Sequence, residues 1–251
     1  MIVITGATRN IGRPLVERLV RAGEEVTTVS RRPSADGPPE GVADHRADLA
    51  DPASLQPALQ GAEAVFLLIA GELLAGGDDP AKLLRVVRDS GVQRVVLMSS
   101  QAARTRPSAV SHERLRQFEQ AAASSGLATT ILRPGGFTTN AYAWIDPIRR
   151  SRAVAAPFAD VGLPVVDPGD IAEAAAVTLR DPGHAGRTYV LTGPAAVSPR
   201  QRVRAISDAI GVDLAFAEQT RDEARGQMLQ FMPAAVVDGT LDILGDPTHE
   251  E

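Results

Sequence analysis

The stretch TGATRNIG, residues 5–12, follows a short apolar run and leads into an amphipathic pattern. Its two glycines permit a tight turn and a close approach of backbone amides and a helix N-terminus to a pyrophosphate. Hydroxyl and amide side chains in the same stretch can donate further hydrogen bonds. The pattern predicts a dinucleotide-binding loop, with a strand-to-helix turn that binds nothing as the alternative. The loop residues expected at the cofactor are Gly6, Thr8, Arg9, Asn10, Ile11 and Gly12.

The end of the next apolar run carries Ser30, Arg31 and Arg32. A site that selects NAD has an aspartate or glutamate at this point, where it binds the ribose hydroxyls. A guanidinium instead binds a 2′-phosphate, which a carboxylate would repel. Arg9 can reach the same phosphate from the loop. We therefore expect NADP(H) to be preferred, with NAD(H) as the other candidate; solvated arginines are the alternative, above all for Arg32.

Alternating apolar runs and amphipathic stretches must position these residues. The first half of the chain predicts buried strands at 2–5, 26–30, 64–69, 94–98 and 129–132. A capping oxygen before a proline marks helix starts at Asp51-Pro52, Asp79-Pro80, Asp167-Pro168 and Ser198-Pro199. This order predicts an α/β fold, a doubly wound Rossmann-type parallel sheet with helices on both faces.

The rhythm of the sequence changes after about residue 135. Helices are expected at 137–149, 168–180, 199–210, 221–231 and 234–244, strands at 188–191 and 214–217, and a frayed tail at 245–251. We expect a dinucleotide-binding core over 1–135 and a smaller C-terminal substrate-binding cap over 136–251. The two parts should interleave as one compact unit.

Charge and composition limit the classes of partner. The 251 residues carry a net charge of −5 without a basic run, which argues against nucleic acid or a membrane surface as a partner. The chain has no cysteine, and its four histidines lack metal-ligand spacing, so no metal site is expected. No segment is apolar and long enough for a signal peptide or a membrane span. A cytoplasmic protein, monomeric or homodimeric, is the expectation.

Several stretches together resemble the NmrA-like group of atypical short-chain dehydrogenases, over most of the chain. They are TGATRNIG at 5–12, the strand end at Arg31, Ala47-Asp48-Leu49, VFLLIAG at 65–71, RVVLMSS at 94–100 and SGLATTILRPGGFTTN at 125–140. The resemblance implies an NAD(P)H-binding Rossmann fold and a quinone-reductase-like or isoflavone-reductase-like activity. It also implies cofactor contacts at the ends of the later strands. These are Asp48 and Leu49 at the adenine, Leu68, Ile69 and Ala70 along the ribose, Ser99 at the nicotinamide ribose, and Pro134 at the nicotinamide.

Two features depart from that family. The middle glycine of the loop is replaced by Arg9, so either this side chain points away from the pyrophosphate or the cofactor sits slightly higher. The Tyr-x-x-x-Lys pair of mainstream members is missing, because no lysine or arginine follows either tyrosine by four residues. The corresponding stretch, SHERLRQFE at 111–119, offers His112 and Arg116 on one helical face. His112 and Ser99 are therefore the candidate catalytic residues, with a solvent-exposed histidine as the alternative.

A quinone or an aromatic carbonyl fits a site of this kind. Such a substrate stabilises the negative charge of its reduced form and needs little help from a protein acid. Phe137, Tyr142 and Trp144 could line an apolar pocket for it, ordinary core packing being the alternative. The sequence thus predicts an NAD(P)H-dependent oxidoreductase acting on a flat aromatic small molecule. A non-catalytic sensor of NADP(H) and a tailoring enzyme of aromatic polyketide synthesis are the other hypotheses.

Overall fold

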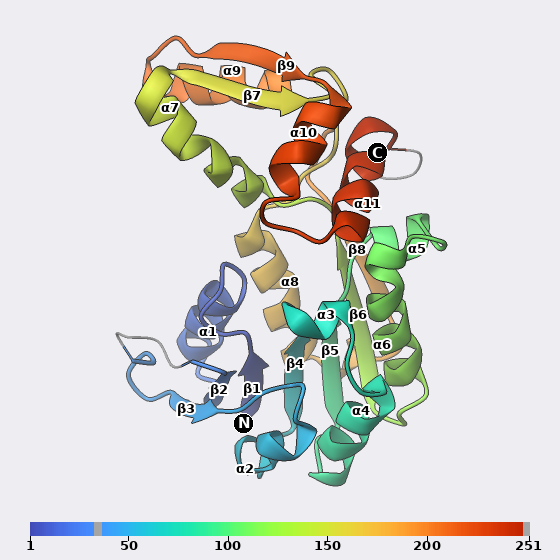
Figure 1. Ribbon diagram of the computed structural model, residues 1–251. Helices are drawn as coiled ribbons and strands as arrows, with labels where there is room; N and C mark the ends of the chain where they lie inside the picture. The colour runs from blue at the N-terminus through green and yellow to red at the C-terminus, as the bar shows by residue number, and fades with distance from the viewer. Residues whose placement is uncertain (33–36, 248–251) are drawn as a thin grey trace.

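Parallel strands form the central sheet of the computed structural model, which describes residues 1–32 and 37–247 (Figure 1). In the described residues the sheet has 7 strands in the order β3-β2-β1-β4-β5-β6-β8, all paired in parallel. Their bounds are β1 Ile2–Thr5, β2 Val26–Ser30, β3 Ala43–Arg46, β4 Ala64–Leu68, β5 Arg94–Met98, β6 Ala128–Pro134 and β8 Thr188–Leu191. The predicted α/β fold is confirmed.

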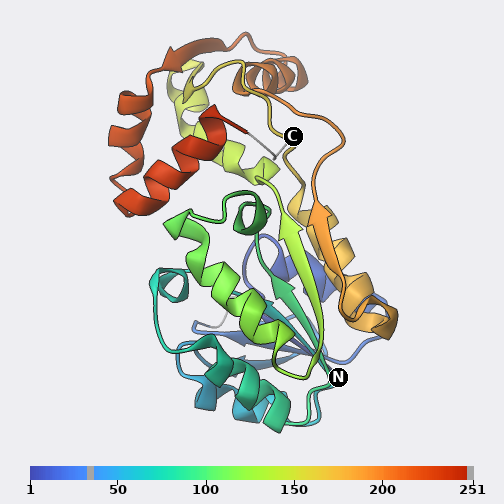
Figure 2. The same cartoon turned by 90° about the vertical axis from the view of Figure 1, so that its right-hand side faces the viewer.

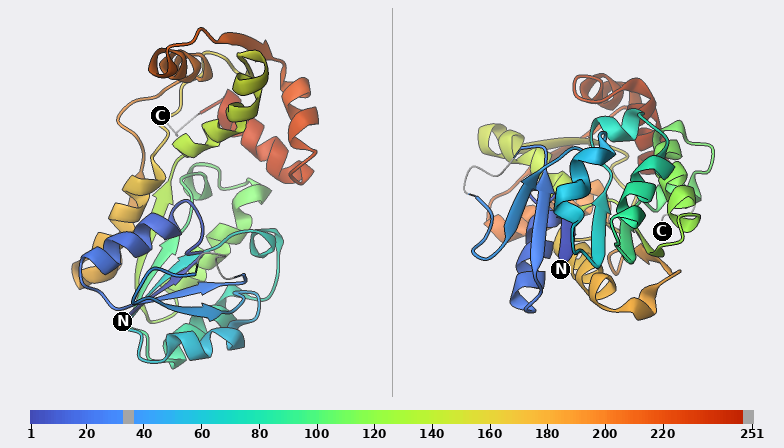
Figure 3. Two further views of the ribbon diagram at one scale, coloured as in Figure 1. Left: turned by 90° about the vertical axis from the view of Figure 1, so that its left-hand side faces the viewer. Right: turned by 90° about the horizontal axis from the view of Figure 1, so that it is seen from below.

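Helices cover both faces of this sheet. One face carries α1 (Gly12–Arg21) and α8 (Pro168–Arg180), which lie side by side (Figure 3). The other face carries α2 (Gln56–Leu59), α4 (Pro80–Asp89) and α6 (Glu113–Ala123). Two apolar layers result, one around Leu15 and Ile171 and the other around Leu84 and Phe118, all of them fully buried. Burial of both faces explains the apolar sequences of the central strands β1, β4 and β5, whereas the edge strands β3 and β8 are partly exposed.

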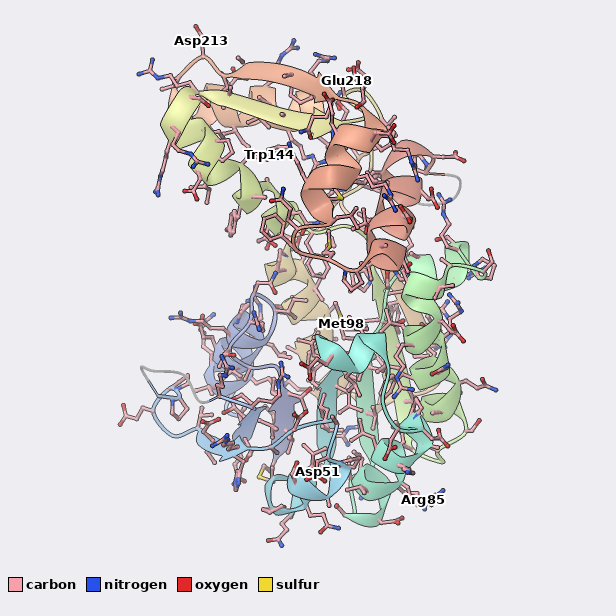
Figure 4. The ribbon with its side chains drawn as sticks, viewed as in Figure 1. Asp51, Arg85, Met98, Trp144, Asp213 and Glu218 are labelled. Carbon is pink, nitrogen blue, oxygen red and sulfur yellow. The ribbon has the colours of Figure 1, made fainter. Side chains whose placement is uncertain are left out.

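The strand order reverses between β1 and β4. Chain segments that leave these two strands turn to opposite faces of the sheet, and folds of this class bind their ligands at the carboxyl ends of strands related in this way. Met98, the last residue of β5, lies at this end of the sheet, between the core and the cap (Figure 4). Two short helices, α3 (Glu72–Ala75) and α5 (Ala102–Thr105), follow β4 and β5 there. No helix within the described ranges is long and apolar enough to cross a membrane.

Helix capping follows the prediction at three of the four Asp-Pro and Ser-Pro pairs. The side chains of Asp79, Asp167 and Ser198 accept hydrogen bonds from the first turns of α4, α8 and α9 (Pro199–Ile210). The prediction for Asp51 is wrong, since its side chain makes no capping bond and the 3-10 turn η1 (Pro52–Leu55) follows. At this turn it is the hydroxyl of Ser54 that forms the side-chain hydrogen bond, which it donates to the carbonyl of Asp51 at 2.6 Å.

The cap is built from the two segments that follow β6 and β8. The first contains the 3-10 turn η3 (Thr138–Trp144), α7 (Ile145–Ser151) and β7 (Ala153–Pro157). The second contains α9, β9 (Ala215–Gln219), α10 (Arg221–Met228) and α11 (Ala234–Gly245). The strands β7 and β9 pair in parallel as a second sheet beyond the carboxyl ends of the core strands (Figures 1 and 2). The boundary at residue 135 stays a prediction, and α8 and β8 return to the core layers.

Helix α11 attaches the cap to the core. It packs on the 3-10 turn η2 (Val110–His112), where a Cβ on Gly239 would lie 2.5 Å from the Ser111 hydroxyl oxygen. The Arg106 guanidinium donates a hydrogen bond to the carbonyl of Asp246. The expectation of a frayed tail is therefore wrong at Gly245 and Asp246, while 248–251 lie outside the described residues. The remaining 3-10 turn, η4 (Pro182–His184), precedes β8.

Candidate functional site

Both loop glycines are required, because a side chain at either position would overlap neighbouring atoms. Gly6 has φ +68°, and a Cβ there would lie 2.5 Å from Leu68 Cδ2, so the loop rests on the end of β4. A Cβ on Gly12 would lie 2.3 Å from the carbonyl oxygen of Gly6. The start of α1 therefore packs directly on the backbone of the turn. This cradle, which side chains would fill, fits the pyrophosphate of a dinucleotide.

The N-terminus of α1 faces this turn without a side-chain cap. Ile11, at the capping position, is 1% exposed and offers no acceptor to the first amides of the helix. The amide of Arg13 donates to the carbonyl of Arg9, and Pro14 has no amide hydrogen, so the amide of Gly12 and the positive end of the helix dipole are left for an anionic ligand. Phosphate binding by this loop stays a prediction.

Asn10 connects the loop to the cap. Its side-chain amide donates a hydrogen bond to the hydroxyl of Thr139 in η3, at 3.2 Å. Thr138, the neighbouring residue, donates to the carboxylate of Asp167, which caps α8. Thr8 and Arg9 are exposed beside Asn10. Asn10, which follows Arg9 at the position of the missing glycine, therefore links the predicted cofactor loop to the cap.

Arg31 reaches across the carboxyl end of the sheet. The chain turns sharply at Gly71, φ +64°, after β4, and a Cβ there would lie 3.5 Å from the Arg31 guanidinium. The side chain thus extends from the end of β2 past β1 to the turn after β4. Neither Arg31 nor Arg9 forms an ion pair within residues 1–32 and 37–247. As far as the described residues are concerned, both guanidinium groups are available to bind a phosphate.

The residues expected along the adenosine differ in what they contact. Asp48 accepts a hydrogen bond from the amide of Ala50 at 3.0 Å, which stabilises the local turn. Leu49 packs against the edge of the core, Ile69 is 5% exposed within it, and Ala70 is exposed. The side chain of Ile69 is used entirely in core packing, whereas Leu49 and Ala70 have surface that a ligand can contact. Their cofactor contacts stay predictions.

A buried ion pair lies at the ends of β5 and β6. Arg133 binds Glu119 of α6 through two hydrogen bonds, Nε to Oε1 at 2.9 Å and Nη2 to Oε2 at 2.6 Å. The hydroxyl of Ser99 donates to the same Oε1 at 2.5 Å. These hydrogen bonds and the adjacent negative charge raise the pKa of Arg133 above its ordinary value. Sequence reasoning missed this pair, although an arginine inside the apolar run TTILRP requires an acceptor.

This network determines what Ser99 can do. Because its hydroxyl proton is directed at Glu119, Ser99 offers a neighbouring ligand an acceptor oxygen and no proton. Pro134, which follows Arg133 in β6, is buried beside it. In this arrangement Ser99 serves better as a binding group at the strand ends than as an acid, and its catalytic assignment stays a prediction.

His112 occupies a different position from the one expected. It lies in η2, before α6 begins, and its Nδ1 is 3.0 Å from the hydroxyl oxygen of Ser111. Arg116, on α6, donates to the carbonyls of Arg106 and Ala109. His112 is the capping residue of α6 and Arg116 lies in its first turns, so the helical face expected for the two stays a prediction. His112 lies at the junction with α11, and its role as an acid stays a prediction.

The three cap aromatics have separate surroundings. Phe137 packs against the core, and its backbone bridges to Val166. Tyr142 is 68% exposed and available to a ligand. Trp144 is half-buried under the guanidinium of Arg202, whose Cζ lies 5.3 Å from the centre of the indole. Core packing thus accounts for Phe137, while Tyr142 and Trp144 keep their predicted part in substrate binding.

The match to a protein-family model agrees with this geometry. The model, described as NAD(P)H-binding, matches residues 6–182, from the first loop glycine to the end of α8 and just beyond. The chain belongs to the NAD(P)H-binding family. The matched range includes the loop, the Arg31 strand end and the Glu119–Arg133 pair.

Similar proteins are named as reductases. A (4-alkanoyl-5-oxo-2,5-dihydrofuran-3-yl)methyl phosphate reductase of Streptomyces griseus is 33% identical over 246 residues, covering 96% of this chain and 85% of its own. Quinone oxidoreductase 2 of Escherichia coli is 25% identical over 250 residues, covering 98% and 86%. The solved structure of an Escherichia coli NADPH-dependent quinone oxidoreductase with NADPH has a TM-score of 0.79 and covers 98% of this chain and 87% of that one, at 25% identity.

These relatives confirm three expectations at the level of the family. The predicted relationship to atypical short-chain dehydrogenases holds, as does NAD(P)H as the cofactor class. This member of the NAD(P)H-binding family is an oxidoreductase, as expected.

Proposed function

We propose that the protein reduces a flat, conjugated and electron-poor small molecule, a quinone or an aromatic or unsaturated carbonyl compound. The observation that carries the proposal is the hydrogen bond that Ser99 donates to Glu119, the partner of Arg133, in a chain without a Tyr-x-x-x-Lys pair. The strand ends therefore present groups that can bind a substrate, but they present no strong acid. A substrate that delocalises its own negative charge needs none. NAD(P)H, when bound, supplies the hydride.

The names of the relatives support this substrate class. The Escherichia coli protein is named for quinones, and the Streptomyces griseus protein for a furanone that carries an alkanoyl group and a phosphate ester. Both acceptors have a double bond conjugated to a carbonyl. Addition of a hydride to such a bond produces a stabilised oxyanion, which water can protonate. The residues of this chain then have to bind and orient the substrate and exclude bulk water.

Arg31 and Arg9 support NADPH as the preferred cofactor. Replacement of Arg31 by alanine should lower NADPH affinity by about 10- to 100-fold, because a guanidinium–phosphate contact contributes about 1–3 kcal/mol. NADH affinity should stay unchanged. Fluorescence titration with each cofactor measures the ratio. The neighbouring Arg32→Ala variant is the matched control, and an Arg31→Ala protein with the wild-type NADPH/NADH ratio would refute the assignment.

A panel of acceptors tests the proposed function. Oxidation of NADPH, followed by its absorbance, should be catalysed with menadione and with an acyl-substituted unsaturated lactone. It should not be catalysed with cyclohexanone, whose isolated carbonyl requires an acid. NADPH binding without turnover of any conjugated acceptor would reject the reductase proposal in favour of a sensor of NADP(H). Rapid cyclohexanone reduction would show that an acid such as His112 acts.

A further inference from the structure

One half-buried arginine of the cap has a buried nitrogen atom without a hydrogen-bond partner in the described part of the chain. Arg202, on α9, has its Nε completely removed from solvent, and that atom has no hydrogen-bond partner among the described residues. Within the same ranges no carboxylate forms an ion pair with its guanidinium. Burial alone lowers the pKa of Arg202 from its ordinary value. The side chain as a whole is only half-buried, but a buried N–H group without an acceptor still costs free energy.

Other cap arginines show how unusual this is. Arg200, two residues earlier on the same helix, also lies over an aromatic ring, with its Cζ 5.0 Å from the centre of Phe216. Yet Arg200 binds Asp160 through two hydrogen bonds of 2.8 and 3.2 Å. Arg225 similarly binds Asp238 at 2.7 Å. Arg202 has the aromatic neighbour and lacks the anion.

The aromatic neighbour places Arg202 near the predicted substrate region. Trp144 lies beneath β7, on the side of the two-stranded sheet that faces the core (Figure 4). It ends η3, the segment that also carries the exposed Tyr142 and the Thr139 bound by the cofactor loop. The guanidinium that covers its ring therefore belongs to the same face of the cap.

We propose that Arg202, backed by Trp144, binds a phosphate monoester on the substrate, at the end remote from the reduced bond. This inference rests on the proposed function and narrows its substrate class. A guanidinium presents its N–H groups as a planar fork that matches two phosphate oxygens, and an indole face supports it from behind. The phosphate would bind the outer N–H groups of the guanidinium, because Nε itself is closed to solvent. The site then distinguishes a phosphorylated acceptor from the corresponding alcohol.

The single tryptophan of the chain gives a direct test of binding. Trp144 is the only indole, so its fluorescence reports on this site alone. Benzyl phosphate, titrated with NADP⁺ at saturation, should change the fluorescence saturably in wild type and in Arg200→Met, whereas benzyl alcohol should not. Arg202→Met should bind benzyl phosphate at least about 10-fold more weakly. Equal affinity in the Arg202→Met and Arg200→Met proteins would overturn the proposal.

A second measurement separates this inference from the proposed function. The ratio of kcat/KM for a hydroxymethyl naphthoquinone phosphate over its free alcohol should exceed about 10 in wild type and Arg200→Met, and should approach 1 in Arg202→Met. Turnover of both quinones with a ratio near 1 in wild type would overturn the phosphate site and keep the reductase. Turnover of neither would reject the reductase, and the fluorescence titration would still decide the site. Thermal melting checks folding, and Arg202→Met should melt no lower than wild type, because it removes an unpaired charge.

Discussion

Replacement of Gly12 by alanine should lower NADPH affinity by about 10- to 100-fold, because the added methyl group has no space. Its Cβ would lie 2.3 Å from the Gly6 carbonyl oxygen and 2.6 Å from the Cα of Ala7. Both are backbone atoms, so no side-chain rotation relieves the overlap. The start of α1 must move away from the turn, and the Gly12 amide that is predicted to face the pyrophosphate moves with it. Fluorescence titration with NADPH measures the loss.

Gly226 provides the matched control. It lies in α10, and no atom outside its own helical surroundings lies within 4 Å of the Cβ that alanine would add there. Gly226→Ala should leave NADPH affinity unchanged and raise stability by up to about 1 kcal/mol, the difference between glycine and alanine in a helix. Wild-type NADPH affinity in Gly12→Ala would show that the cofactor does not depend on this loop.

Replacement of Glu119 by alanine should lower the free energy of unfolding by about 3–5 kcal/mol. The carboxylate is 11% exposed and is the partner of Arg133, which is 17% exposed, so its loss leaves a largely buried charge unpaired. The Ser99 hydroxyl loses its acceptor as well. Urea unfolding, followed by circular dichroism, measures the change.

Two comparisons identify the cause of that loss. Glu17→Ala removes a glutamate from an exposed pair with Arg13, and it should cost no more than about 0.5 kcal/mol. The double replacement of Glu119 and Arg133 by methionine removes both charges together, and it should cost less than Glu119→Ala alone. A double variant less stable than the single one would show that the pair stabilises the fold beyond mutual neutralisation.

The core could be predicted because its signals are local. The central strands of the parallel sheet are largely apolar runs, and the range predicted for Thr188–Leu191 matches its observed bounds. The edge strand β3, with the polar and partly exposed sequence ADHR, has no such signal and no range was predicted for it. The strand β7 was missed, because AVAAP is short, ends in proline and pairs only with the distant β9. Its position depends on a contact between two segments, which no local pattern records.

The candidate site divides in the same way. The loop around Gly6 and Gly12 is contiguous, so its glycine spacing could be interpreted directly. The partnership of Glu119 with Arg133, and the placement of Arg202 over Trp144, bring together residues from separate elements. A lone arginine in a strand signals a missing acceptor without identifying it. The order of the strands and helices in the fold brings the acceptor next to the arginine, so the partner can be identified only from the structure.

The return of α8 and β8 to the core sets an order of events during synthesis. Until β8 emerges from the ribosome, β6 is an open edge with unpaired backbone groups at Ile131 and Leu132. The face that holds α1 also stays half-covered until α8 arrives, after the first cap segment has already been made. The nascent core must therefore wait for the cap segment between β6 and α8. Any delay in that segment prolongs the time for which an apolar face and a strand edge can meet other chains.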